Sequence, residues 1–225
     1  MVSRVLFLLF GSFGVGAAGN SKAQVFELPG YGAPPTTHYS GFVEVDAASE
    51  SHLFYYFVES ASAPGSDPLV WWMNGGPGAS SFAGLFSENG PLLLNDAGAL
   101  VENPFSYNQR ANVLYVEFGA GVGYSYCKNS SRTDVECPQS STTCSPCLSN
   151  DSTVASQNVA FFRGFLDLFP DLKGRPLLLT GESYAGVYGP TLAAELLEAF
   201  DDVSEAAPQH EGASMSLQLE CFAIN

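Results

Sequence analysis

The stretch Leu177-Leu-Leu-Thr-Gly-Glu-Ser183-Tyr-Ala-Gly186 decides the fold of this chain. A short apolar run leads into a glycine, and the residues after the serine suit the start of a helix. This pattern predicts a strand, a tight turn and a helix, with the Ser183 hydroxyl exposed at the tip of the turn. Such a turn needs small residues two positions before and after the serine, and Gly181 and Ala185 meet that need. Alone the match is weak, because an ordinary turn with a surface serine has the same residues.

Strand patterns occur on the N-terminal side of this turn. Residues 68–73 and 112–118 are nearly continuous apolar runs followed by glycines, as expected for strands buried on both faces. Residues 38–45 and 53–59 are rich in aromatic and β-branched side chains, and the segment Asp46-Ala-Ala-Ser-Glu50 lies between them. They predict an antiparallel hairpin.

Two segments have helical patterns. Residues 151–169 carry an apolar face between Asp151, which can cap a helix, and a proline that stops it. A second helix is predicted with Pro190 in its first turn. Residues 216–224 return to a strand pattern. The alternation of buried strands and helices predicts an α/β fold with a mostly parallel sheet and an antiparallel N-terminal hairpin.

The composition is that of a folded acidic protein. The 225 residues suffice for one substantial core, and 46% of them are hydrophobic against 14% charged. Eight Lys and Arg face 23 Asp and Glu, which gives a net charge of −15. Binding to nucleic acid or to an anionic membrane is therefore not expected, since both need clustered positive charge, and we expect no stable membrane association. The acidity suits solubility or an acidic compartment.

The N-terminus predicts entry into the secretory pathway. Residues 1–20 have a positive charge, an apolar run over 5–15 and small residues, which is the pattern of a signal peptide. The run is shorter than the ~20 residues of a membrane-spanning helix; an uncleaved anchor is the alternative. Sequons at Asn129 and Asn150 predict N-glycosylation.

Four of the five cysteines fall in a Ser/Thr-rich stretch at about residues 127–150. They are Cys127, Cys137, Cys144 and Cys147. In an oxidising compartment two local disulfides are expected among them, with the pairing open. The spacing of Cys144-Ser-Pro-Cys147 also suits zinc, but a secreted chain disfavours that alternative, and we expect no metal and no cofactor. Cys221 is left over.

A second glycine-rich stretch, Trp72-Met-Asn-Gly-Gly-Pro-Gly-Ala-Ser-Ser81, follows a predicted strand. Loops of this kind leave backbone N–H groups unpaired, and two such groups ~3 Å from a developing oxyanion stabilise an acyl-transfer intermediate. Only glycine lets the backbone approach so closely. A phosphate-binding loop or a plain turn is the alternative, and no Gly-Lys-Ser/Thr supports phosphate.

Five motifs then occur in a fixed order. They are Asn74-Gly-Gly-Pro-Gly-Ala-Ser-Ser81, Glu88-Asn-Gly-Pro91, Asn103-Pro-Phe-Ser-Tyr-Asn108, Gly121-Val-Gly-Tyr-Ser-Tyr126 and Gly181-Glu-Ser-Tyr-Ala-Gly186. Together they resemble the serine carboxypeptidases, an α/β-hydrolase family of secretory and lysosomal or vacuolar enzymes. The resemblance runs from about residue 39 to the last residue.

The resemblance implies roles for specific residues. Ser183 would be the acylating nucleophile, with the backbone N–H groups of Gly76 and Tyr184 as the oxyanion hole. The free carboxylate of a peptide or protein C-terminus would be held by Asn74, Glu88 and Glu182, with Trp72 lining the pocket. Two adjacent glutamates do not both ionise cheaply, so one tends to keep its proton and can donate to the substrate carboxylate. Binding should therefore weaken as pH rises. Without the surrounding motifs, the two glutamates would be interpreted as solvated acids.

Some family features are missing. Ala79 replaces a cysteine, Phe118-Gly119 replaces a Ser-Pro or Gln-Pro pair, and residues 127–150 resemble an insertion. After Ser183 the only histidine is His210, which precedes the next predicted strand, so no Asp–His pair completes a triad. We therefore expect residues 21–225 to be a partial domain, cut before the cap region and the last strands and inactive alone.

The sequence thus predicts a serine-type carboxypeptidase acting on C-termini through an acyl-enzyme, either secreted or in a vacuole or lysosome. An acyltransferase on the same scaffold and a non-catalytic binding or protective protein are the alternatives. Residue preference and oligomeric state are not readable from the residues.

Overall fold

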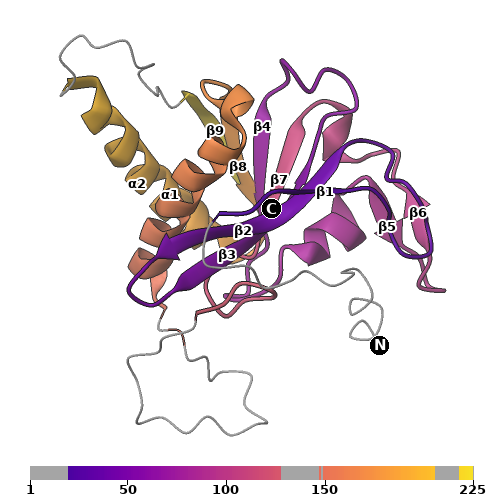
Figure 1. Cartoon of the computed structure of the whole chain (residues 1–225), viewed down its shortest axis with the longest axis horizontal. Helices are drawn as coiled ribbons and strands as arrows, with labels where there is room; N and C mark the ends of the chain where they lie inside the picture. The colour runs from indigo at the N-terminus through magenta and orange to yellow at the C-terminus, as the bar shows by residue number, and fades with distance from the viewer. Residues whose placement is uncertain (1–19, 128–146, 148, 206–217, 225) are drawn as a thin grey trace, which may run out of the picture.

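The chain folds around a seven-stranded sheet, which the computed structural model describes over residues 20–127, 147, 149–205 and 218–224 (Figure 1). The strand order is β1-β2-β3-β7-β4-β8-β9. The bounds are β1 (Ala23–Val25), β2 (His38–Asp46), β3 (Ser51–Val58), β4 (Leu69–Met73), β7 (Asn112–Val116), β8 (Pro176–Gly181) and β9 (Gln218–Ile224). Strands β1, β2, β3 and β7 pair antiparallel, whereas β7, β4, β8 and β9 pair parallel. The predicted α/β fold with its N-terminal hairpin is confirmed.

The remaining elements cover the two faces of this sheet. They are η3 (Gly84–Glu88), β5 (Leu92–Leu94), β6 (Leu100–Glu102), η4 (Tyr107–Gln109), α1 (Asp151–Leu168), η5 (Pro170–Leu172) and α2 (Ala185–Glu205). Helices α1 and α2 lie together over one face (Figure 1), where Trp71 and Phe165 belong to the larger core. On the other face Trp72 packs with Phe86 of η3 in a second core.

Strand β4 shows why its apolar run is uninterrupted. All five of its residues are buried. Leu69, Trp71 and Met73 point into the larger core, while Val70 and Trp72 point into the second. Successive side chains of a strand face opposite sides, so a strand between two cores has no polar position. The prediction of a strand buried on both faces is confirmed.

Helix α1 begins one residue away from the predicted cap. Asn150, not Asp151, is the N-cap, and its Oδ1 accepts hydrogen bonds from the Thr153 N–H at 2.9 Å and the Thr153 hydroxyl at 3.1 Å. Asp151 is the first helical residue, where its charge faces the positive end of the helix. The predicted cap is therefore wrong by one residue; asparagine and aspartate are both good caps, so residue type does not decide between these two neighbours.

Replacing Asn150 with alanine should cost about 1 kcal/mol of folding free energy, because the Thr153 N–H loses its acceptor. Urea unfolding of the variant measures this loss. Asn150 also begins a sequon, so Ser152→Ala is the matched control: it removes the sequon and leaves the cap. Equal destabilisation by both substitutions would contradict the capping role.

Helix α2 begins earlier than predicted. It starts at Ala185, directly after the turn, and Pro190 lies inside it rather than in its first turn. The carbonyl of Tyr184 accepts from the N–H groups of Val187 and Tyr188, so the turn itself nucleates the helix. The position of Pro190 therefore did not mark the start of the helix, because the turn at Ser183 sets where the helix begins.

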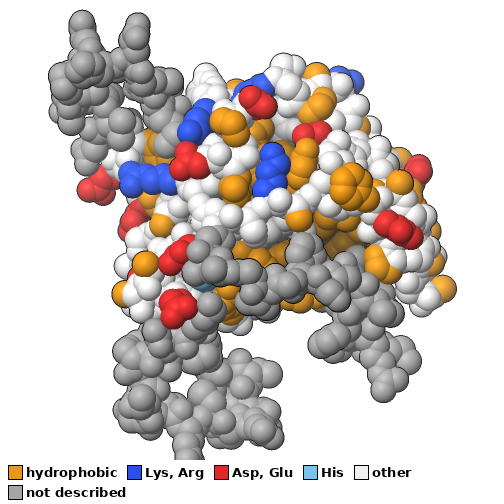
Figure 2. Space-filling view, in the orientation of Figure 1, with side chains coloured by type: hydrophobic (Ala, Val, Ile, Leu, Met, Phe, Trp, Pro, Cys, Tyr) orange, Lys and Arg blue, Asp and Glu red, His pale blue; other side chains and the backbone are white. Residues whose placement is uncertain are grey.

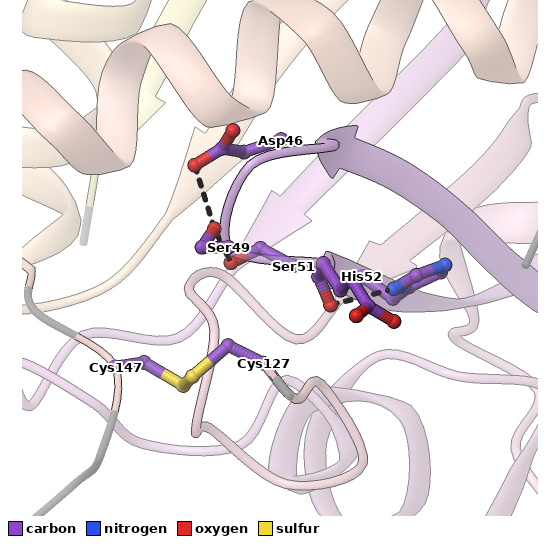
Figure 3. Close-up of a disulfide and its surroundings, with 7 residues drawn as sticks. Asp46, Ser49, Ser51, His52, Cys127 and Cys147 are labelled. Atoms are coloured by element: carbon purple, nitrogen blue, oxygen red, sulfur yellow. Dashed lines mark hydrogen bonds between the residues drawn. A yellow bond between two sulfur atoms is a disulfide. The ribbon is translucent and has the colours of Figure 1, made fainter. Parts of the chain in front are cut away.

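A disulfide lies beside the β2–β3 turn (Figure 3). It joins Cys127 and Cys147, whose Cα atoms are 5.9 Å apart, and both residues pack against the larger core. Cys137 and Cys144 lie outside the described residues, as do residues 1–19 of the predicted signal segment, Asn129 and His210. The structure thus describes one bridge within the cysteine-bearing stretch.

The described surface carries mixed charge. On the face in Figure 2 the Lys and Arg side chains lie apart from one another among Asp and Glu. Phe26 and Phe105 are the most exposed of the large hydrophobic side chains, at 74% and 87%. Within the ranges that the structure describes, neither helix combines the length and apolarity needed to cross a bilayer.

Candidate active site

The turn after β8 holds Ser183 in a strained, exposed position. Ser183 has a φ of +56°, in the left-handed region that residues with a side chain rarely adopt. A Cβ on Gly181 would lie 2.6 Å from the Cβ of Ala185 and 2.3 Å from the carbonyl oxygen of Met73. The turn therefore requires small residues on both sides of the serine, as the sequence predicts.

The glycine-rich loop after β4 packs directly on this turn. A Cβ on Gly75 would lie 2.4 Å from the backbone nitrogen of Tyr184 and 2.7 Å from the carbonyl oxygen of Glu182. Gly76 is exposed and has a φ of +110°. The two segments that carry the predicted oxyanion donors, Gly76 and Tyr184, are thus neighbours, and glycine is what permits their approach.

Asn74 joins three of the predicted substrate-binding residues. Its Nδ2 donates to Glu88 Oε1 at 3.0 Å and to Glu182 Oε1 at 2.8 Å. Its Oδ1 accepts from Trp72 Nε1 at 2.8 Å and from the Gly84 N–H at 3.0 Å. Every donor and acceptor of this buried amide is used, so its orientation is fixed. Glu182 is half-buried and Glu88 is exposed, so the two carboxylates border solvent.

Two sequence motifs serve to position Glu88. Asn89 Oδ1, one residue later, accepts from the buried hydroxyl of Tyr115 at 2.8 Å. Asn103 Nδ2 donates to the Gly90 carbonyl at 2.9 Å. These bonds fasten the end of η3 to β7 and to the loop after β6. The Glu88-Asn-Gly-Pro91 and Asn103-to-Asn108 motifs therefore support the carboxylate of Glu88 at Asn74.

Tyr188 is a residue that the sequence gave no reason to select. Its hydroxyl accepts from the Gly78 N–H at 3.2 Å, so the first turns of α2 hold the far side of the glycine-rich loop. Its ring lies edge-on to that of Tyr184, with centroids 5.2 Å apart. The Tyr184 hydroxyl in turn donates to the Asp151 carboxylate at 3.2 Å. Helices α1 and α2 thereby fix the residue after the serine.

Glu117 is a second residue missing from the sequence prediction. It follows β7, is 1% exposed, and accepts a hydrogen bond from the Ser80 hydroxyl at 2.7 Å. Burial raises the pKa of Glu117 to about 7, although hydrogen bonds from Ser80 and from the Ser81 backbone partly oppose this shift. A lone carboxyl inside an apolar run was the signal that could have identified it.

The two histidines that the structure describes, His38 and His52, are hydrogen-bonded to residues other than Ser183. His38 Nδ1 lies 3.0 Å from the Tyr56 hydroxyl, and burial lowers the pKa of His38 to about 4, so the ring is neutral. His52 Nδ1 lies 3.0 Å from the Glu50 carbonyl oxygen.

Within the described ranges no side chain is hydrogen-bonded to the Ser183 hydroxyl. None of the His, Cys, Asp and Glu side chains in those ranges form a group suited to a metal. The described part of the site therefore contains the exposed Ser183 and its polar surroundings, with both described histidines hydrogen-bonded to other residues.

Comparison with known proteins agrees with this geometry. The fold, with a serine at a strand–turn–helix elbow, is that of an α/β hydrolase. The profile of the serine carboxypeptidase family matches residues 29–217, and the chain belongs to that family.

Two relatives illustrate the similarity. The chain is 40% identical over 195 residues to serine carboxypeptidase ctsa-4.1 of Caenorhabditis elegans. It is 39% identical over 196 residues to the lysosomal protective protein of Mus musculus. Each alignment covers 86% of this chain and 38% of the relative, so the chain spans well under half of their length.

Among solved structures the fold is similar to that of Kex1Δp, a prohormone-processing carboxypeptidase from Saccharomyces cerevisiae. The TM-score is 0.66 at 22% identity, over 84% of this chain and 38% of that chain. At this identity the match supports the fold alone.

Proposed function

We propose that the protein is a serine-type carboxypeptidase that releases C-terminal residues from peptides and proteins. The observation that carries this proposal is Asn74, whose amide joins Glu88 and Glu182 next to the turn that presents Ser183. A cluster of acids around an amide donor is suited to a carboxylic ligand when one acid is protonated. The backbone carries a free carboxylate only at its C-terminus, so a pocket that holds this group next to Ser183 would select chain ends.

In the proposed reaction the substrate carboxylate lies at the Asn74 cluster and its last peptide carbonyl lies over Ser183. The serine oxygen attacks the carbonyl carbon, and its proton passes to a base that the described residues do not include. Backbone N–H groups of Gly76 and Tyr184 stabilise the oxyanion. The C–N bond then breaks, the terminal amino acid leaves with a proton, and water hydrolyses the acyl-serine. Ser183 is exposed at a strained backbone position, which leaves its side chain accessible to a substrate.

The protein purified from the cells that make it provides the test. We expect a fluorophosphonate probe to label it at Ser183, and Ser183→Ala to abolish labelling. Peptides with a free C-terminus should be shortened, and C-terminally amidated peptides should react about tenfold more slowly or worse, because charge-assisted hydrogen bonds are lost. Equal turnover of free and amidated peptides would contradict the carboxylate pocket.

A non-catalytic binding or protective role is the second candidate. One observation favours it: in the part of the chain that the structure describes, Ser183 has no base. A protein of this kind would keep the Asn74 cluster and bind peptide C-termini, but it would not label. An acyltransferase would label at Ser183 and transfer its acyl group to an alcohol instead of water. Probe labelling followed by product analysis therefore separates all three.

We also infer that the protein passes through the secretory pathway, to be secreted or to reach a lysosome or vacuole. The pattern of residues 1–20, the sequons and the Cys127–Cys147 disulfide support this route. One relative is named for the lysosome. A glycosidase-sensitive shift in gel mobility would test it.

A further inference from the structure

Glu117 occupies an unusual place for a carboxyl group. It directly follows β7, accepts a hydrogen bond from Ser80 of the glycine-rich loop, and is 1% exposed. A Cβ on Gly123 would lie 2.3 Å from its carboxyl carbon, so the loop after β7 has a glycine where the acid needs space. An unpaired charge at such a depth is costly, so a buried acid without a cation tends to stay protonated.

The contacts of Glu117 lead to the loop that carries Gly76. The Ser80 hydroxyl donates to Oε1 at 2.7 Å, and the Ser81 backbone N–H also bonds to the carboxyl. The Ser81 hydroxyl accepts from the Asn74 N–H at 3.4 Å. One carboxyl group is thus connected to the end of the loop and, through Ser81, to the residue that would orient the substrate carboxylate.

Two further hydrogen bonds hold the middle of the loop. The Ala79 N–H donates to the Gly75 carbonyl at 3.1 Å, and the Gly78 N–H donates to the Tyr188 hydroxyl. The first is internal to the loop, and the second reaches only its tip. Neither of them joins the C-terminal end of the loop to the sheet, whereas the hydrogen bond from Ser80 to Glu117 at the end of β7 does.

We propose that Glu117 is a positioning residue: its neutral carboxyl holds the glycine-rich loop in the shape that the oxyanion hole requires, and its ionisation disturbs that shape. This inference rests on the proposed function of Ser183 and Gly76. It assigns a role to a residue that would touch neither the substrate nor the reacting atoms.

The surroundings of Glu117 favour the neutral form up to neutral pH. Burial raises the pKa of Glu117 to about 7. The titratable group that faces it is Tyr124, whose own pKa is raised first by burial and then by the charge of Glu117. Among the described residues, no basic side chain lowers the pKa of Glu117. Its Oε2 has no hydrogen-bond partner in that part of the chain, so an anion there would be poorly solvated. It would also repel the negative charge that develops on an oxyanion.

The rate of labelling of Ser183 by an uncharged fluorophosphonate, measured from pH 5 to 8, tests the proposal. Such a probe has no carboxylate and does not report on the Asn74 cluster. Glu117→Gln stays neutral at every pH and can still accept from Ser80. With a pKa of about 7, the neutral fraction of Glu117 falls about tenfold between pH 6 and pH 8. The ratio of the Glu117→Gln rate to the wild-type rate should therefore rise about tenfold over that range.

Two other variants complete the design. Glu117→Ala leaves Ser80 and the Ser81 N–H without their acceptor and should label about tenfold more slowly than Glu117→Gln at pH 5. Glu198→Gln removes an exposed acid of α2 and should leave the pH profile unchanged. A Glu117→Gln to wild-type ratio that stays within about twofold from pH 6 to pH 8 would overturn the proposal.

A readout independent of labelling separates this inference from the proposed function. The carboxyl carbon of Glu117 and the amide proton of Ser81 can be followed by NMR as pH rises. Both should titrate with one midpoint close to pH 7. A wild-type protein that titrates in this way but does not label would refute the proposed function alone. A midpoint below pH 5 would refute the role of Glu117, whether or not Ser183 labels.

Discussion

Replacing Asn74 with aspartate is expected to cost about 4 kcal/mol of folding free energy at pH 7 and to prevent binding of a carboxylate ligand. The wild-type Nδ2 donates to Glu88 and Glu182, at 3.0 and 2.8 Å. The aspartate would turn an acceptor oxygen toward two carboxyl oxygens, so both hydrogen bonds are lost, each worth up to about 1.5–3 kcal/mol. A negative charge would also enter a site that already holds two acids and is buried at Asn74.

The destabilisation of Asn74→Asp should decrease in acid. A protonated carboxyl can donate again, so at pH 4 the variant regains part of the lost bonding. Urea unfolding at pH 4 and pH 7 measures the difference. Asn95→Asp is the matched control, because exposed Asn95 uses only its Oδ1, which accepts from the Ala97 and Ala99 N–H groups, and aspartate retains that oxygen. If both variants unfold at the same urea concentration at pH 7, the proposed role of the Asn74 amide is wrong.

The strands and the serine turn were predictable because their causes are local. Apolar runs of five or six residues identify β4 and β7, and the steric limits of a tight turn identify the need for Gly181 and Ala185. The start of α2 was not predictable by the same rules. Pro190 suits a first turn, but the strained turn at Ser183 had already begun the helix.

The contacts of Asn74 with Glu88 and Glu182 cannot be predicted from local sequence patterns. Asn74 bonds residues that are 14 and 108 positions away, and no periodicity relates them. The sequence suggested the set only through the family resemblance. The structure adds the physical reason, which is that Trp72 and Gly84 fix the amide oxygen and leave both amide protons for the acids. Glu117 was not predictable from local patterns for the same reason, because its partners Ser80 and Ser81 reach it only in the folded sheet.

Replacing Glu117 with glutamine is expected to stabilise the protein by about 3 kcal/mol at pH 8 and to leave its stability unchanged at pH 4. The pKa of this carboxyl is raised from 4.5 to about 7 on folding. Between these values the unfolded chain releases the proton while the folded protein retains it, so folding becomes less favourable as pH rises. The cost begins near pH 4.5, grows to its full size near pH 7, and is then constant.

The comparison isolates one group because every other acid titrates in both proteins. The difference in unfolding free energy between Glu117→Gln and wild type should therefore follow the ionisation of Glu117 alone. Chemical denaturation at pH 4, 6 and 8 gives this curve, and the exposed Glu198→Gln variant should give a flat one. A flat curve for Glu117→Gln would mean that the folded protein solvates the anion. A stability difference that rises with pH would mean that wild type retains an acid that lowers its free energy of unfolding at neutral pH. Such a loss of stability is expected of a residue that is kept because it positions the glycine-rich loop.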